Sequence, residues 1–181
     1  MTTKIKILIA VGLIGLAVVG RLVPHLWNMT PVAAVGLLAG SRMGLGWGIA
    51  VPLLAMAITD PILGFAGLSV MAIIYGCFAL TGLTGYFLRN SKKVYAILGG
   101  SFVSTMIFFF ATNAATWRWG TMYPHDFSGL AASYIAGIPF LQNQLIGDLF
   151  FTSALFLAWE GANVLVLKLN KKKGSLFARL Q

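Results

Sequence analysis

The stretch RLVPHLWNMTPVAAVGLLAG, from Arg21 to Gly40, decides the fold of this chain. An apolar segment ends at Arg21, a short loop follows that contains Pro24 and Pro31, and a second apolar segment rich in small residues begins at Val32. Proline suits the first turn of a helix because its missing N–H would have no partner there. The loop holds a cation, an imidazole, an indole and an amide between two apolar segments. We therefore expect it to lie where a bilayer meets water and to line a pocket there.

The composition is that of an all-α, polytopic membrane protein. Apolar residues make up 59% of the 181 residues and charged residues 9%, whereas a soluble domain carries roughly a quarter charged residues. A membrane-spanning helix needs about 20 residues, so six spans with short loops nearly use up the chain, and we expect one membrane domain over residues 1–181. The net charge of +9 does not indicate nucleic-acid binding, because the cations lie at the ends of the apolar segments.

Six transmembrane helices are predicted, together with one short helix that is either interfacial or re-entrant. The spans cover about 5–23, 30–41, 45–59, 67–88, 94–116 and 143–169, and the short helix covers Gly129–Pro139, which is too short to cross a bilayer. Asp60 and Pro61 should end the third span, and Pro52 should kink it. The second and third spans are well below about 20 residues, so they must be tilted, be extended by loops, or stop short of one face.

The distribution of cations predicts the orientation. All Lys and Arg residues except Arg21 and Arg118 lie at the N-terminus, at Arg42, in the loop 89–93 or from Lys168 onward. Six spans place these four regions on one side of the membrane, and the positive-inside rule makes that side cytoplasmic. We therefore expect both termini in the cytoplasm, with Arg21 and Arg118 on the outer side.

Polar side chains gather on this outer side, where the first, third and fifth spans end and the sixth begins. Ionisable residues within spans are costly and usually face a cavity or a partner. We expect Asp148 and Asn113 to hydrogen-bond a ligand directly, Arg21 and Arg118 to favour an anionic group, and Asp60 to pair with one of these two arginines. The predicted substrate-binding residues are Arg21, His25, Asn28, Asp60, Asn113, Trp117, Arg118, Asn143 and Asp148.

Several of these residues also have a purely structural interpretation. Trp117 can anchor the chain at the membrane interface, Asn143 can simply begin a helix, and Asp148 can be hydrogen-bonded inside the bundle. Further along the sixth span, Glu160 and Asn163 share one helix face. They either tie this span to a neighbouring helix, which we favour, or bind a cation.

Signals for catalysis are weak. Neither His25 nor His125 has the spacing of a metal-binding helix, and the sequence contains no G-x-S-x-G and no ATP-binding P-loop. With Asp60 and Asp148, these histidines are the only material for an intramembrane active site. We predict no enzymatic activity, no cofactor and no metal, and expect His125 and Asp126 to lie in a solvated loop.

Three segments carry a resemblance to known proteins: the stretch Arg21–Gly40, AITDPILG (Ala57–Gly64) and IPFLQNQLIGDLFFT (Ile138–Thr152). Together with the Phe-rich run before Thr112, they make about residues 15–160 resemble a family of small bacterial membrane proteins of unassigned function. That family in turn resembles the substrate-binding S components of energy-coupling factor (ECF) transporters, in size, in the six-span layout and in the TPV…LLAG pattern.

The resemblance implies a protein of the bacterial inner membrane that binds a vitamin-like micronutrient near the extracellular face. It also implies docking on an ECF energising module of one membrane subunit and two ATPases, usually through an Ala-xxx-Ala face of the first span. Here that span has Ala10, Gly12, Gly15, Ala17 and Gly20 but no Ala-xxx-Ala. The function expected is a substrate-binding subunit for micronutrient uptake. The alternative is a structural or assembly membrane protein without a small-molecule ligand.

Overall fold

The computed structural model describes the backbone of residues 1–91 and 93–177 and the side chains of residues 1–91, 93–166 and 168. Within these residues all regular structure is helical: α1 (Thr3–Leu22), α2 (Val32–Met43), α3 (Leu45–Leu63), α4 (Leu68–Phe87), α5 (Val94–Trp119) and α6 (Phe127–Phe177). Five of these helices are long and apolar enough to cross a membrane, and α2 is not. The prediction of an all-α, membrane-like fold is confirmed, while the count of six spans stays a prediction.

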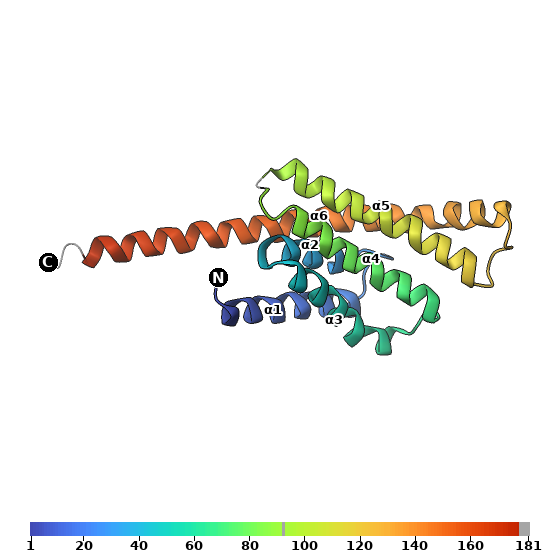
Figure 1. The fold of residues 1–181 in the computed structure, drawn as a ribbon, viewed down its shortest axis with the longest axis horizontal. Coiled ribbons are helices and arrows are strands. Elements are labelled where there is room, and N and C mark those ends of the chain that lie inside the picture. The colour runs from blue at the N-terminus through green and yellow to red at the C-terminus, as the bar shows by residue number, and fades with distance from the viewer. Residues whose placement is uncertain (92, 178–181) are drawn as a thin grey trace.

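The short helix α2 lies at the centre of the bundle, and the other five helices pack around it (Figure 1). Every residue of α2 except Arg42 is buried. Its 12 residues rise about 18 Å, whereas the hydrocarbon core of a bilayer is about 30 Å thick. A central helix of this length cannot fill the bundle from end to end, so it leaves space at the end where it begins.

Glycines set the packing at the opposite end of α2. A Cβ atom on Gly40 would collide with the backbone carbonyl of Gly82 in α4, and one on Gly48 in α3 would lie 2.6 Å from the Cα of Gly40. Small residues of this kind let membrane helices approach closely. Three helix backbones therefore meet here with no side chain between them.

The third helix does not end at Asp60 and Pro61 as predicted. It continues through Pro61 to Leu63 and ends at Gly64, whose φ of 100° lies in the left-handed region that glycine favours. Pro61 removes only one backbone hydrogen bond of the helix. The bond from the Gly64 N–H to the Asp60 carbonyl, at 2.8 Å, is kept and closes the last turn. With 19 residues, α3 has the length of a membrane span, and only α2 is short.

The segment Gly129–Pro139 is not a separate helix, which corrects a second prediction. It forms the first turns of α6, a continuous helix of 51 residues with Pro139 inside it. The Ser133 hydroxyl donates a hydrogen bond to the Asn113 carbonyl of α5 at 3.2 Å. Contact with the long helix α5 supports the residues before Pro139, so the proline interrupts the hydrogen-bond ladder without ending the helix.

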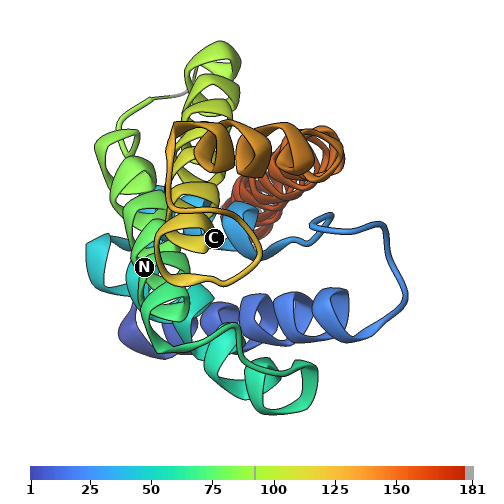
Figure 2. The ribbon, with the colours of Figure 1, turned by 90° about the vertical axis from the view of Figure 1, so that its right-hand side faces the viewer.

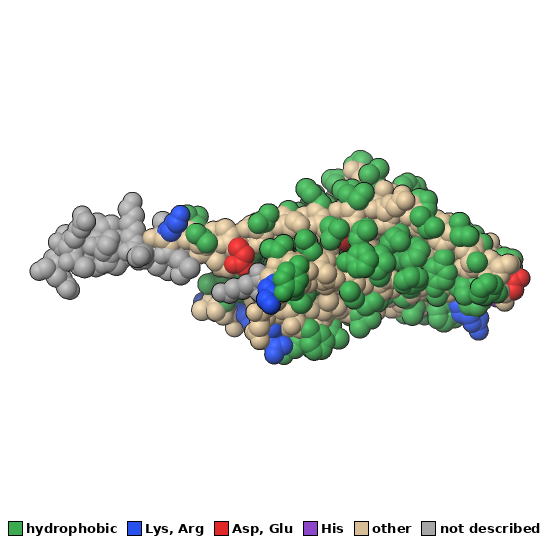
Figure 3. Space-filling view, turned by 90° about the horizontal axis from the view of Figure 1, so that it is seen from above, with side chains coloured by type: hydrophobic (Ala, Val, Ile, Leu, Met, Phe, Trp, Pro, Cys, Tyr) green, Lys and Arg blue, Asp and Glu red, His purple; other side chains and the backbone are tan. Residues whose placement is uncertain are grey.

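The start of α1 and the end of α6 lie toward the same end of the molecule (Figure 1). The Lys6 ammonium donates to the Met43 carbonyl at 2.8 Å, which brings the N-terminus beside the turn between α2 and α3. Apolar side chains cover most of the face seen in Figure 3, and Lys and Arg side chains lie near the two ends of the bundle. This distribution is typical of a protein that crosses a bilayer.

Candidate functional site

A cavity of about 580 Å³ lies at the end of the bundle where α2 begins. Val32 and Ala33, the first residues of α2, contribute to its wall, and the other lining residues come from the remaining five helices and from the loops that follow α1 and α3. Ligand-binding pockets in proteins measure about 300–1,000 Å³. The cavity occupies the space that the short central helix leaves empty.

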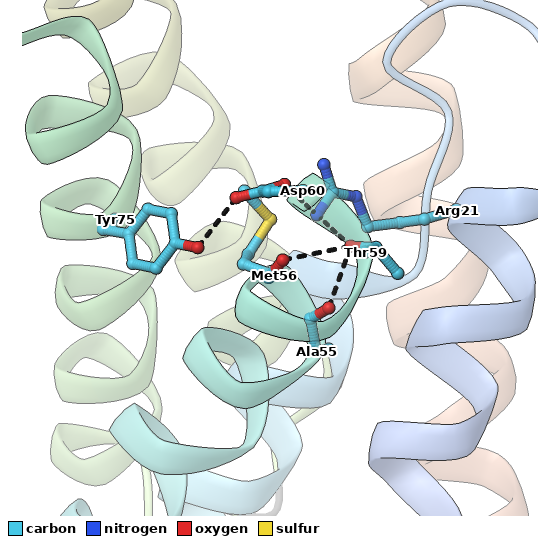
Figure 4. A network of polar contacts seen from close by, with 6 residues as sticks. All are labelled: Arg21, Ala55, Met56, Thr59, Asp60 and Tyr75. Carbon is cyan, nitrogen blue, oxygen red and sulfur yellow. Dashed lines mark hydrogen bonds and ion pairs between the residues drawn. The ribbon is translucent and has the colours of Figure 1, made fainter. Parts of the chain in front are cut away.

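A network of four polar side chains lies at one side of the cavity (Figure 4), and two of them, Arg21 and Asp60, line it. An Arg21 guanidinium nitrogen donates to Asp60 Oδ1 at 2.8 Å and also to the Thr59 hydroxyl. The Tyr75 hydroxyl donates to Asp60 Oδ2 at 2.7 Å. Asp60 thus lies between α1 and α4 with both oxygens engaged, and the predicted pairing of Asp60 with an outer arginine is confirmed for Arg21.

Asp148 and Gln144 are polar residues that α6 contributes to the cavity wall. The Asp148 side chain is 2% exposed, and its Oδ2 accepts a hydrogen bond from the Thr105 hydroxyl of α5 at 2.7 Å. The Gln144 amide lies one turn earlier on the same face of α6 and is also close to the carboxylate. Within the part of the chain with described side chains, no Lys or Arg forms an ion pair with Asp148.

The loop between α1 and α2 lines the cavity and is held by contacts with α6; Figure 2 shows the course of this loop from the end of α1 to the start of α2. Met29 packs so closely on α6 that a Cβ atom at Gly147 would lie 2.7 Å from its side chain. The Trp27 ring meets the Phe140 ring edge-on, with centroids 5.8 Å apart, although the indole is 73% exposed. Asn28 has a φ of 62°, a left-handed conformation that asparagine tolerates better than most residues.

The structure places five of the nine predicted site residues around this cavity. These five are Arg21, His25, Asn28, Asp60 and Asp148. No hydrogen bond joins His25, Asp60 and Asp148 to one another among the described residues, and no three His, Cys, Asp or Glu side chains there come together as a metal site. Among the described residues, these three titratable groups therefore lie at the cavity without forming one hydrogen-bonded cluster.

The remaining four predicted residues lie outside the cavity wall. Asn113 faces α6 at Gly137 and donates from its amide to the Phe109 carbonyl at 2.8 Å. The Trp117 indole donates to the Pro124 carbonyl at 2.9 Å and so fixes the loop before α6. Arg118 is exposed and Asn143 is half-buried on another face of α6.

The loop before α6 has a structural role that the sequence did not predict. The Gly129 N–H and the Ser128 hydroxyl each donate to Asp126 Oδ1 at 2.8 Å. These bonds lower the pKa of the Asp126 carboxyl below its usual value, with the bond from Gly129 as the main cause. Asp126 therefore caps α6, and an aspartate directly before a helix is the known signal for that role.

The nine predicted site residues left out several residues of the cavity. Gln144 follows from helical geometry, because it is four residues before Asp148 and so shares its face. Tyr75 and Thr105 act behind the wall as partners of the two carboxylates. The apolar lining residues carry no signal that separates them from lipid-facing residues in sequence; they include Met56, Met71, Ile74, Phe78 and Phe108.

At the opposite end of the bundle, Glu160 has the structural role that we favoured. Its carboxylate accepts a hydrogen bond from Arg42 of α2 at 3.1 Å and so ties α6 to the central helix. Arg42 also lies 5.2 Å from the centre of the Phe156 ring. Asn163, its predicted companion, is exposed.

Comparison with known proteins places this chain in a family without an assigned function. No curated protein and no solved structure matches the chain. A family model does match, over residues 1–169, and it is described as a family of unknown function, DUF6580. The chain therefore belongs to DUF6580.

Proposed function

We propose that the protein is the substrate-binding subunit of a micronutrient uptake system in the bacterial inner membrane, with both termini cytoplasmic. The observation that carries this proposal is the cavity at the start of α2, which combines apolar walls with the polar groups of Arg21, Asp60, Asp148 and Gln144. Burying such groups in an apolar bundle is costly. A protein that needs only to fold can avoid that cost, whereas one that binds a ligand uses these groups to orient it.

The position of the loop between α1 and α2 supports the same function. The loop between α1 and α2 borders the cavity, and its exposed members His25 and Trp27 can meet a ligand as it arrives. Because the loop is fixed by contacts with α6 at Phe140 and Gly147, it can hold a bound ligand without first having to fold.

Transport would require further subunits, because the sequence contains no ATP-binding P-loop. We propose an energising module with its own membrane subunit and two ATPases. The exposed side of α1 is the surface for this contact, since Gly12 and Gly15 there have open space around them and Leu8, Val11 and Val19 are exposed. Small residues on a membrane helix let a partner helix approach closely.

The second candidate is a structural or assembly protein that binds no small molecule. One observation favours it: Asp148 and Asn113 both find hydrogen-bond partners inside the bundle, at Thr105 and Phe109. The two proposals differ in whether the cavity is occupied in the membrane.

The deciding experiment compares the native protein with a variant whose cavity is blocked. Tagged protein is purified from native membranes in mild detergent, and mass spectrometry identifies the proteins and small molecules that elute with it. Ala66→Trp places an indole at the cavity wall, and Ala154→Trp places the same ring on an exposed face of α6. We expect a small molecule with native protein and with Ala154→Trp, but not with Ala66→Trp.

Co-elution of an ATPase pair with its membrane subunit would support the uptake system. If no small molecule elutes with any of the three proteins, the substrate-binding function is wrong and the structural alternative takes its place.

A further inference from the structure

We propose that the cavity binds a small organic cation, such as a protonated amine on an apolar ring or chain, with Asp148 as its counterion. This inference rests on the proposed function, because it names the substrate class of the same cavity. It differs from what the two outer arginines suggest in the sequence, namely an anionic ligand.

The charges around the cavity decide between these two ligand classes. Arg21 is 2.8 Å from Asp60, whose oxygens are both engaged, so the positive charge of Arg21 is already compensated. Arg118 is not part of the wall. Of the two acidic residues that line the cavity, Asp148 is the one that forms no ion pair with a described Lys or Arg.

The hydrogen bonds of Asp148 leave room for a ligand. A carboxylate offers about four acceptor positions, and the neighbours of Asp148 are the uncharged Thr105 hydroxyl and Gln144 amide. The single hydrogen of Thr105 is also within reach of the Ser101 carbonyl, at 3.0 Å. A buried carboxylate with so few donors is a strong acceptor for a charged N–H group, since charge-assisted hydrogen bonds are the stronger ones.

The rest of the wall indicates an organic cation rather than a metal ion. Phe78 and Phe108 both line the cavity with ring centroids 5.3 Å apart, and Met56, Met71 and Ile74 add further apolar surface. Aromatic faces attract cations, and the attraction grows when water is excluded. A cavity of about 580 Å³ with these walls has room for an apolar body as well as a cationic group.

Two groups at the cavity could repel a cation, but each contributes less charge there than an ionised Asp148. The N-terminus of α2 reaches the cavity at Val32 and Ala33, and a helix N-terminus is equivalent to about half a positive charge. His25 also lines the cavity, but it lies in the exposed loop at the mouth. An ionised Asp148 carries a full charge in the buried wall, so it remains the larger of these uncompensated charges.

The test uses matched probes that differ only in the charged group. These are 2-phenylethylammonium, 3-phenylpropanoate and 3-phenylpropanamide, added to full-length protein in mild detergent. Binding is followed by thermal shift and by the fluorescence of the tryptophans, of which Trp27 lies at the cavity. We expect the ammonium probe to bind at least about tenfold more tightly than the other two probes.

Two variants separate the counterion from the fold. Asp148→Asn should weaken ammonium binding about 10- to 100-fold, whereas Asp126→Asn, a matched change at the cap of α6, should leave it unchanged. If Asp148→Asn does not fold, Phe108→Leu takes its place, because it keeps the carboxylate and should weaken ammonium binding about 3- to 10-fold.

The remaining outcomes test the cation assignment and the substrate-binding function separately. A preference for the carboxylate probe, or ammonium binding that Asp148→Asn or Phe108→Leu leaves intact, overturns the cation assignment and leaves the substrate-binding function standing. When none of the three probes binds, the molecule released from natively purified protein decides: a cation supports the assignment, and an anion or neutral molecule overturns it. Absence of any bound molecule overturns the proposed function as well.

Discussion

Each end of the bundle holds an arginine that pairs with a carboxylate from another helix, but the two carboxylates differ in their surroundings. Asp60, the partner of Arg21, is 2% exposed and is also held by Tyr75. Glu160, the partner of Arg42, is 54% exposed. The arginines themselves are similar, at 15% and 11% exposed, so the difference lies in the acid.

The helices pack more closely beside the exposed pair than beside the buried pair. Beside Arg42, the backbones of α2, α3 and α4 meet at Gly40, Gly48 and Gly82 with no space between them. Beside Arg21, the bundle encloses a cavity of about 580 Å³. One end is thus held by close backbone contact, and the other is held by a buried ion pair around an open space. A smaller cavity, of about 320 Å³, borders Arg42 and Glu160 between α5 and α6, so the larger space lies beside the buried pair.

The largest expected effect is at the buried pair. Asp60→Asn keeps the shape of the side chain but leaves Arg21 as an uncompensated, largely buried cation. Removing one partner of a buried pair costs about 3–5 kcal/mol. We expect the free energy of unfolding, measured by SDS titration in mixed micelles, to fall by about 3 kcal/mol.

A double variant shows whether charge is the cause. Arg21→Met combined with Asp60→Leu removes both charges, and replacing a buried pair by apolar residues is often nearly neutral. Recovery of most of the lost stability would support this explanation. A double variant as unstable as Asp60→Asn would instead mean that packing in the Arg21, Thr59 and Tyr75 network is what matters.

Much of this fold could be predicted from the sequence, because long apolar segments and the charges between them specify membrane helices. The order of the helices and the shortness of α2 follow from that pattern. The continuity of α6 through Pro139 could not be predicted, because it depends on contact with α5, including the bond from Ser133 to Asn113. A proline has the same sequence signal whether or not a neighbouring helix supports it.

The candidate site was predictable where a charged residue lies within an apolar segment. Asp148, Asp60 and Arg21 satisfy that condition, and all three line the cavity. Asn113 is uncharged, and its amide can find a partner within its own helix, as it does here at the Phe109 carbonyl. An amide within an apolar segment is therefore a weaker signal for a site than a charged residue. Phe108 could not be predicted as a cavity residue, since the sequence does not distinguish aromatic residues that face the inside of the bundle from those that face lipid.

A smaller effect is expected at the close-packed end. A Cβ atom at Gly82 would collide with the Gly48 carbonyl, a backbone group that cannot move aside cheaply. Overpacking of this kind costs about 1–3 kcal/mol, so Gly82→Ala should lower the free energy of unfolding by about 2 kcal/mol. Gly76→Ala is the control in the same helix, because its Cβ atom would meet nothing within 4 Å.

Alanine is the better helix former by about 1 kcal/mol, so Gly76→Ala should leave the stability equal or raise it. Similar losses from both substitutions would show that helix flexibility, and not the contact of α3 with α4, sets the stability of this end.

The smallest effect is expected at the exposed pair. Glu160→Gln is the same change of carboxylate to amide as Asp60→Asn, but at a side chain that is 54% exposed. Arg42 keeps the Ser91 carbonyl, at 3.4 Å, and the Phe156 ring as neighbours. Exposed ion pairs contribute about 0–1 kcal/mol, so the free energy of unfolding should fall by less than about 1 kcal/mol in the same SDS titration. A loss as large as that of Asp60→Asn would mean that Glu160 is as important as Asp60, and the contrast between the two ends would then not rest on burial of the acid.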